Sequence, residues 1–184
     1  MLETLNNRDE LGAWLTQHGF EGQAVEIGAL NGANARQWIS TWGQGTLTLI
    51  DPWAPQDPTV YKERQDWTDF EACLKECMML EDEFPKRIRL LRSLSMNAVW
   101  QFQDKSLDVC YVDGNHAYEA AMADFCAWWP KIKSGGILGA HDYWENREPP
   151  AWGEVKVVAD HFSAGMRIPF RHTPKCGSVW FQKP

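Results

Sequence analysis

Short polar groups follow several apolar runs of the chain, and their residue types can bind nucleotides or metals or transfer protons. The groups are Glu26 and Gly28 after AV, Asp51 after TLTLI, Asp113 after LDVCYV, and His141-Asp142 after ILGA. Acidic side chains can accept hydrogen bonds from ribose hydroxyls, and Asp or His side chains can bind divalent cations or move protons. Each group lies at the end of a predicted strand, so the arrangement of the strands decides whether the groups lie close together.

Strands alternate with helices along the sequence. Strands are predicted at 24–28, 46–51, 88–91, 107–112 and 137–140, and helices at 8–18, 33–42, 68–83, 95–102, 118–129 and about 153–162. Two last strands, near 167–172 and 177–182, predict an antiparallel hairpin. The pattern indicates an α/β fold, a Rossmann-like, doubly wound, mostly parallel seven-stranded sheet in one domain spanning residues 1–184. Ligands bind such sheets at the carboxyl ends of the strands, where the polar groups lie.

Composition narrows the class of protein. The 184 residues carry a formal net charge of −7, which disfavours nucleic acid as a partner because phosphate binding needs clustered positive charge. The sequence has no run of about eighteen apolar residues and no basic start followed by an apolar stretch. Its five cysteines are irregularly spaced and do not suggest a disulfide framework. We therefore expect a cytoplasmic protein without a membrane segment.

The first strand runs into the sequence Glu26-Ile27-Gly28-Ala29-Leu30-Asn31-Gly32, an E-x-G-x-x-x-G pattern. Glycines at such a turn let a ligand approach the backbone. The pattern lacks the first glycine pair of the dinucleotide fingerprint, and Glu26 would repel a pyrophosphate. A cationic ligand without phosphate, such as S-adenosylmethionine, suits this turn better, with Asp51 on its ribose. The alternative is a tight turn with a solvated acid.

Longer motifs make the family recognisable. VEIGALNG, LTLIDPW, LDVCYVDGNHAYEAAMADFCAWWPKIKSGGILGAHDYW and GEVKVVADHF occur in this order, and the chain resembles class I S-adenosylmethionine-dependent methyltransferases. D-G-x-H-x-Y, followed by G-G and H-D-Y, is similar to the small-molecule branch that includes macrocin-type sugar O-methyltransferases. The resemblance implies methyl transfer to a small-molecule acceptor, at a hydroxyl oxygen.

The same resemblance assigns cofactor contacts. Glu26, Gly28 and Gly32 would surround the methionine half of the cofactor, together with Asp113, and Asp51 would bind the ribose. Ser95 would lie near the adenine. Relatives often carry an acidic residue just before that serine, where this chain has Leu94.

A reaction site is predicted around Asp113. His116 lies three residues further on and is, by resemblance, the general base for the acceptor hydroxyl; helix capping or a hydrogen bond to Asp113 is the alternative. Asp113, His141 and Asp142 offer ligands for Mg²⁺ or another divalent metal, as in related methyltransferases. Such relatives often have a carboxylate in place of His141, so H-D-Y could also only shape the pocket.

Tryptophans are unusually frequent. Trp38, Trp42, Trp100, Trp128 and Trp129 follow helical spacing and are predicted in the core. The loops 52–67 and 143–152 carry Trp53, Tyr61, Trp67, Tyr143, Trp144 and Trp152, and we predict that they form a lid over the acceptor. Alternatively these side chains pack the loops or form the contact of a homo-oligomer.

Two other functions remain open at this point. A nicotinamide-dependent oxidoreductase shares the sheet but needs the glycine fingerprint that is absent. A relative without methyl transfer could bind a cofactor or metal for hydroxylase-like chemistry. A triad of two histidines and one carboxylate would then require His116 to reach the metal of Asp113 and His141.

Overall fold

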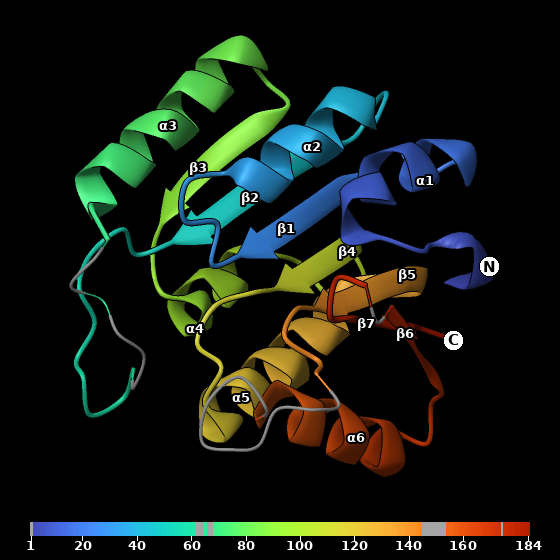
Figure 1. Cartoon of the computed structure of the whole chain (residues 1–184). Helices are drawn as coiled ribbons and strands as arrows, with labels where there is room; N and C mark the ends of the chain where they lie inside the picture. Colours follow the sequence, from blue (N-terminus) through green and yellow to red (C-terminus); the bar gives the residue numbers. More distant parts are fainter. Residues whose placement is uncertain (1, 62–64, 66–67, 145–153, 174) are drawn as a thin grey trace.

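A seven-stranded sheet forms the centre of the protein, as the computed structural model shows for residues 2–61, 65, 68–144, 154–173 and 175–184 (Figure 1). The strands are β1 (Gln23–Ile27), β2 (Thr46–Asp51), β3 (Ile88–Arg92), β4 (Leu107–Val112), β5 (Ile132–Ala140), β6 (Phe170–Thr173) and β7 (Ser178–Gln182). They lie in the order β3-β2-β1-β4-β5-β7-β6. The first five strands are parallel, and β7 pairs antiparallel with both β5 and β6. The predicted fold class is confirmed.

Helices cover both faces of the sheet. They are α1 (Leu11–Gln17), α2 (Ala33–Thr41), α3 (Phe70–Glu83), α4 (Ser95–Ala98), α5 (Tyr118–Trp128) and α6 (Glu154–Met166). Helices α1, α2 and α3 pack on one face and α4, α5 and α6 on the other (Figure 1). Short 3-10 helices add Leu2–Thr4, Arg8–Glu10, Val99–Gln101 and Trp129–Lys131. None of the helices described combines the length and apolarity needed to cross a bilayer.

The central strand β4 shows how the sequence produces two cores. All six of its residues are buried, and alternate side chains point to opposite faces. Val109 and Tyr111 join the core beneath α1, α2 and α3, whereas Cys110 and Val112 join the core beneath α5 and α6. A strand covered on both faces reads as a continuous apolar run, which is why LDVCYV identified it.

Three expectations need correction. Strand β5 begins at Ile132 rather than 137, so the glycine pair that was expected before the strand lies inside it. Glycine suits this place because a Cβ on Gly136 would stand 2.8 Å from the carbonyl oxygen of Asp108 on the neighbouring strand. Strand β6 begins at Phe170 rather than 167, since the amide of Ile168 still donates to Ser163. Trp100 is 80% exposed, and Lys131 lies over its ring. The other four tryptophans predicted in the core are buried.

The aromatic packing of α5 predicts where stability is concentrated. Phe125 is fully buried and makes edge-to-face contacts with Phe162 and Phe181. We expect Phe125→Ala to lower the free energy of unfolding by about 3–5 kcal/mol. The exposed Trp100→Ala, as a control, should change it by no more than about 0.5 kcal/mol. Urea denaturation measures both, and similar losses in the two variants would contradict this description of the core.

Candidate functional site

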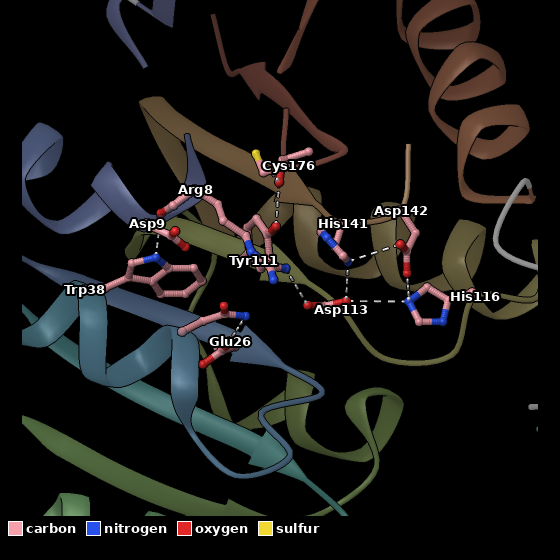
Figure 2. Close-up of polar contacts among 12 residues, drawn as sticks. Arg8, Asp9, Glu26, Trp38, Tyr111, Asp113, His116, His141, Asp142 and Cys176 are labelled. Atoms are coloured by element: carbon pink, nitrogen blue, oxygen red, sulfur yellow. Dashed lines mark hydrogen bonds and ion pairs between the residues drawn. The ribbon is translucent and has the colours of Figure 1, made fainter. Parts of the chain in front are cut away.

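The predicted polar groups meet at one edge of the sheet. Glu26 lies on β1, Asp51 ends β2, Asp113 follows β4, and His141-Asp142 follow β5. Strand β1 lies between β2 and β4, and β5 lies next to β4, so the groups come from four neighbouring strands. Figure 2 shows Glu26, Asp113, His141 and Asp142 side by side, with His116 beyond them. The sequence therefore placed these side chains correctly relative to the strands.

The turn after β1 requires glycine at two positions. Gly28 has a φ of +80°, and a Cβ there would stand 2.1 Å from the carbonyl oxygen of Asp113. Gly32 has a φ of +75° and precedes α2, where a Cβ would lie 3.2 Å from Sγ of Cys77. Both conformations disfavour other residues. Gly28 thus allows β1 and the segment after β4 to approach closely, and Gly32 allows the turn to pass close to α3.

Asp51 is buried and anchored by backbone amides. Its Oδ2 accepts from the amide of Leu30 at 3.0 Å and its Oδ1 from that of Trp53 at 2.7 Å. Burial raises the pKa of Asp51, against these two hydrogen bonds. Each carboxylate oxygen has a further lone pair, so the side chain can still accept from a ribose. The position agrees with the predicted role, which itself stays a prediction.

Glu26 is a buried acid with an unsatisfied oxygen. Its Oε1 accepts from the side-chain amide of Asn34 at 3.1 Å. Its Oε2 has no hydrogen-bond partner among the described residues. Burial raises the pKa of Glu26 to about 8. A buried carboxyl in this state favours a cationic ligand that would restore its charge.

Two carboxylates and two imidazoles form a compact cluster beside Glu26. Nε2 of His116 lies 3.0 Å from Oδ2 of Asp142 and 3.5 Å from Oδ1 of Asp113. Nδ1 of His141 lies 3.3 Å from Oδ1 of Asp113 and 3.2 Å from Oδ1 of Asp142. Asp142 has a φ of +63°, a strained conformation that directs its carboxylate toward both rings. The ligand atoms of Asp113, His141 and Asp142 all lie within 4.8 Å of one another.

The cluster changes the acidity of its members. Burial would lower the pKa of His141, but its hydrogen bonds to Asp113 and Asp142 raise it to about 9. Burial would raise the pKa of each carboxyl, but the hydrogen bonds with His116 and His141 outweigh it and leave both values below the ordinary one. At neutral pH the two acids are therefore ionised and His141 is protonated.

Arg8 is a site residue that the sequence did not predict. Its Nη1 lies 3.3 Å from Oδ2 of Asp113, on the side away from the imidazoles (Figure 2). The residue belongs to the 3-10 helix Arg8–Glu10, before the first strand. Its backbone carbonyl accepts from the indole of Trp38 at 2.7 Å. Neither spacing nor an apolar pattern relates position 8 to position 113, so only the fold reveals the pair.

Ser95 makes contacts that the sequence did not indicate. Its hydroxyl donates to Oδ1 of Asp124 at 2.5 Å and accepts from the indole of Trp128 at 2.7 Å. Burial raises the pKa of Asp124 to about 6. The serine therefore ties α4 to α5, and its contact with adenine stays a prediction. Leu94, just before it, is 48% exposed.

The predicted lid is only partly described. Trp53 is buried, and its indole donates to the carbonyl of Leu30 at 2.6 Å, so it packs the glycine turn, as the alternative expected. Tyr143 is also buried and donates to Asp160. The indole of Trp144 donates to Oδ1 of Asp142 at 2.7 Å and thus supports the cluster. Tyr61 is half-buried. Trp67 and Trp152 lie outside the described residues.

The comparison with known families decides the class of protein. Residues 25–143, from β1 through the H-D-Y motif, match the model of a methyltransferase domain family. The chain belongs to this methyltransferase family. The membership confirms the predicted class and supports S-adenosylmethionine as the cofactor rather than a nicotinamide. The macrocin-type branch stays a prediction.

One curated relative is much longer. The chain is 34% identical over 170 residues to y4gI of Sinorhizobium fredii, an uncharacterised protein. The match covers 88% of this chain and 17% of that relative. The chain thus corresponds to a minor part of the relative's length.

Solved structures share the fold at low identity. The O-methyltransferase NovP matches with a TM-score of 0.70 and 15% identity, over 97% of this chain and 78% of NovP. PaMTH1, a Podospora anserina methyltransferase bound to S-adenosylhomocysteine, matches with 0.66 and 13%, over 96% and 78%. Spermidine synthase from Thermotoga maritima matches with 0.56 and 17%, over 94% and 57%. At these identities the likeness shows the fold, which serves more than one reaction.

The buried Glu26 predicts that cofactor binding releases a proton. With a pKa of about 8, free Glu26 is protonated at pH 7, and a bound ammonium group would favour the ionised form. Binding of S-adenosylhomocysteine at pH 7 should release roughly one proton, and the release should fade above pH 8, where free Glu26 is already ionised.

Titration calorimetry in buffers of different ionisation enthalpy measures this release. The apparent binding enthalpy should change with the buffer for the natural protein and much less for Glu26→Gln. An enthalpy independent of buffer in the natural protein would refute the assignment.

Proposed function

We propose that this protein transfers a methyl group from S-adenosylmethionine to a hydroxyl oxygen of a small molecule. The observation that carries the proposal is the cluster of Asp113, His116, His141 and Asp142 next to the Glu26 turn. The turn offers a buried acid that can bind the cationic end of the cofactor. The cluster offers a base for the acceptor hydroxyl and side chains that can hold a cation beside it. Family membership supports the cofactor, and the cluster supports the class of acceptor.

His116 is suited to remove the hydroxyl proton. Its Nε2 lies 3.0 Å from Asp142, and a carboxylate in this position holds an imidazole in the tautomer with the proton on Nε2. Nδ1 is then the basic nitrogen. The ring is 8% exposed, so its orientation is fixed by packing as well as by the carboxylates. This arrangement leaves Asp142 as the positioning residue and His116 as the general base.

A divalent cation fits the other side of the cluster. Adjacent ligands at bond lengths of 2.0–2.3 Å are separated by about 3 Å, and Nδ1 of His141 lies 3.3 and 3.2 Å from the two carboxylates. Asp113, His141 and Asp142 would hold the ion once His141 gives up its proton. A bound cation would supply positive charge that lowers the pKa of the acceptor hydroxyl.

The proposed roles account for both the proton and the methyl group. His116 would take the proton of the acceptor hydroxyl, and the bound cofactor would supply a methyl group on a sulfonium, whose sulfur would keep the electron pair of the broken carbon–sulfur bond. Asp142 stabilises the imidazolium that results, and the burial of His116 and Asp142 limits access of water.

Hydroxylase-like chemistry receives less support. It would need two histidines and one carboxylate around a common ion. His116 does not belong to the group of described side chains whose ligand atoms all lie within 4.8 Å of one another. Its Nε2 instead lies 3.0 Å from Asp142 and 3.5 Å from Asp113 as an ion-pair partner, which suits proton transfer.

Release of S-adenosylhomocysteine, measured with hexosides, catechols and hydroxy acids as acceptors, tests the function. We expect turnover with at least one of these three classes and formation of a methyl ether, identified by mass spectrometry. Methylation on nitrogen, or no transfer by a sample that binds the cofactor, would contradict the proposal.

His116→Ala should lower turnover by about 10²-fold or more, because the general base is lost, while the affinity for S-adenosylhomocysteine stays nearly unchanged. His161→Ala is the matched control, since His161 is a histidine of α6 that contacts the hydroxyl of Tyr118. Steady-state kinetics and calorimetry measure the two effects. A fully active His116→Ala variant would remove this residue from the mechanism.

The cation site is tested by metal binding. Asp142→Asn should weaken Mn²⁺ binding by at least about 10-fold, and dialysis against a chelator should reduce methyl transfer. Asp104→Asn, which changes a surface carboxylate paired with Lys131, should bind Mn²⁺ like the natural protein. Electron paramagnetic resonance gives the free Mn²⁺ concentration. Full activity after chelation would show that H-D-Y shapes the pocket without a metal.

A further inference from the structure

The amino-terminal segment places a cation beside the buried acid of β1. Residues 2–10, the N-terminal strap, precede α1 and include Leu5, which is fully buried. The indole of Trp14 donates to Thr4, and Arg171 donates to Asn6. The strap is therefore attached to the domain at several points before it reaches Arg8.

Arg8 itself is held in a defined position. Its carbonyl accepts from the buried Trp38 of α2, and Asn7 caps the short helix by accepting from the amide of Asp9. The side chain is 24% exposed and extends to Asp113, where one nitrogen makes a contact of 3.3 Å. A guanidinium has five N–H donors in a planar fork, so its contacts with Asp113 and Tyr111 leave donors for a further ligand.

Glu26 and Arg8 lie close enough to interact electrostatically. Figure 2 shows both side chains on one side of Asp113, Glu26 from β1 and Arg8 from the strap. Two carboxylates, Asp113 and Asp51, and one cation, Arg8, act electrostatically on Glu26. Because Oε2 of Glu26 has no partner among the described residues, a carboxyl group and a cationic donor are both available to a ligand that carries both charges.

An α-amino acid end is such a ligand. Its ammonium and carboxylate groups are attached to the same carbon, so a matching site needs an anion and a cation close together. Glu26 satisfies the ammonium, and a carboxylate can accept two parallel N–H bonds from an arginine. Without Arg8, the carboxylate of the ligand would face Glu26, Asp51 and Asp113 with no compensating charge.

We propose that Arg8 of the N-terminal strap binds the carboxylate of S-adenosylmethionine, while Glu26 binds its ammonium group. The inference rests on the proposed function, because it requires that cofactor. It assigns to the strap a direct part in cofactor recognition, so that selectivity for the complete amino acid end depends on a segment outside the strands.

The test compares two ligands that differ in one group. The first is S-adenosylhomocysteine, and the second is its decarboxylated analogue, which keeps the ammonium. Arg8→Gln should weaken binding of S-adenosylhomocysteine by roughly 10- to 100-fold and change binding of the analogue by less than about 3-fold. Glu26→Gln should weaken both ligands. Calorimetry gives the dissociation constants.

Controls separate recognition from folding. Arg89→Gln removes the same charge from β3, where Arg89 donates to Gln101, and should leave both affinities unchanged. Arg8→Lys keeps a point charge and should recover part of the lost affinity for S-adenosylhomocysteine. Thermal denaturation shows whether each variant is folded. If Arg8→Gln is unfolded, the natural protein still provides a test, since it should bind the analogue at least about 10-fold more weakly.

The outcomes are distinguishable. Equal weakening of both ligands in Arg8→Gln, or no weakening of either, would overturn the proposal, as would equal affinity of the natural protein for both ligands. If the natural protein bound neither ligand, the proposed function itself would fail.

Discussion

The close approach of β1 and the segment after β4 is the constraint on which the site depends. The amide of Asp113 donates to the carbonyl of Ile27 at 2.8 Å, and the carbonyl of Asp113 occupies the space where Gly28 would carry a side chain. This contact fixes the distance between the acid of β1 and the cluster that follows β4 and β5. Asp51, His141 and Asp142 lie at the ends of neighbouring strands, so the sheet sets the geometry of most of the site.

Gathering carboxylates at one edge is unfavourable unless each finds a partner. Asp51 is satisfied by two amides, Asp142 by the indole of Trp144 and two imidazoles, and Asp113 by Arg8 and the same imidazoles. Glu26 differs, because Asn34 satisfies only one of its oxygens. The unfavourable burial is thus concentrated on the group that we propose binds the ammonium of the cofactor, where binding of the ligand would relieve it.

The sequence patterns predicted those features of the fold that follow from local periodicity. Continuous apolar runs marked the buried strands, and the polar residues that follow them lie at the strand ends, which brought Glu26, Asp51 and Asp113 together. Other features depend on contacts distant in sequence. The backbone of Arg8, whose side chain contacts Asp113, accepts a hydrogen bond from Trp38, and the indole of the buried Trp53 donates to Leu30. Trp100 fits helical spacing, yet α4 ends at Ala98 and leaves it on the surface.

The contact of Arg8 with Asp113 would couple the proposed binding of the cofactor to the cluster. In the free protein the guanidinium satisfies Oδ2 of a carboxylate whose other oxygen faces His116 and His141. A cofactor carboxylate would bind other donors of the same guanidinium and share its positive charge, and any weakening of the Arg8 contact would make Asp113 a stronger ligand for a cation. Binding of the methyl donor would therefore favour binding of a cation at Asp113. Because binding free energies are reciprocal, a cation at Asp113 would in turn favour the cofactor, which would give the N-terminal strap a part in binding both.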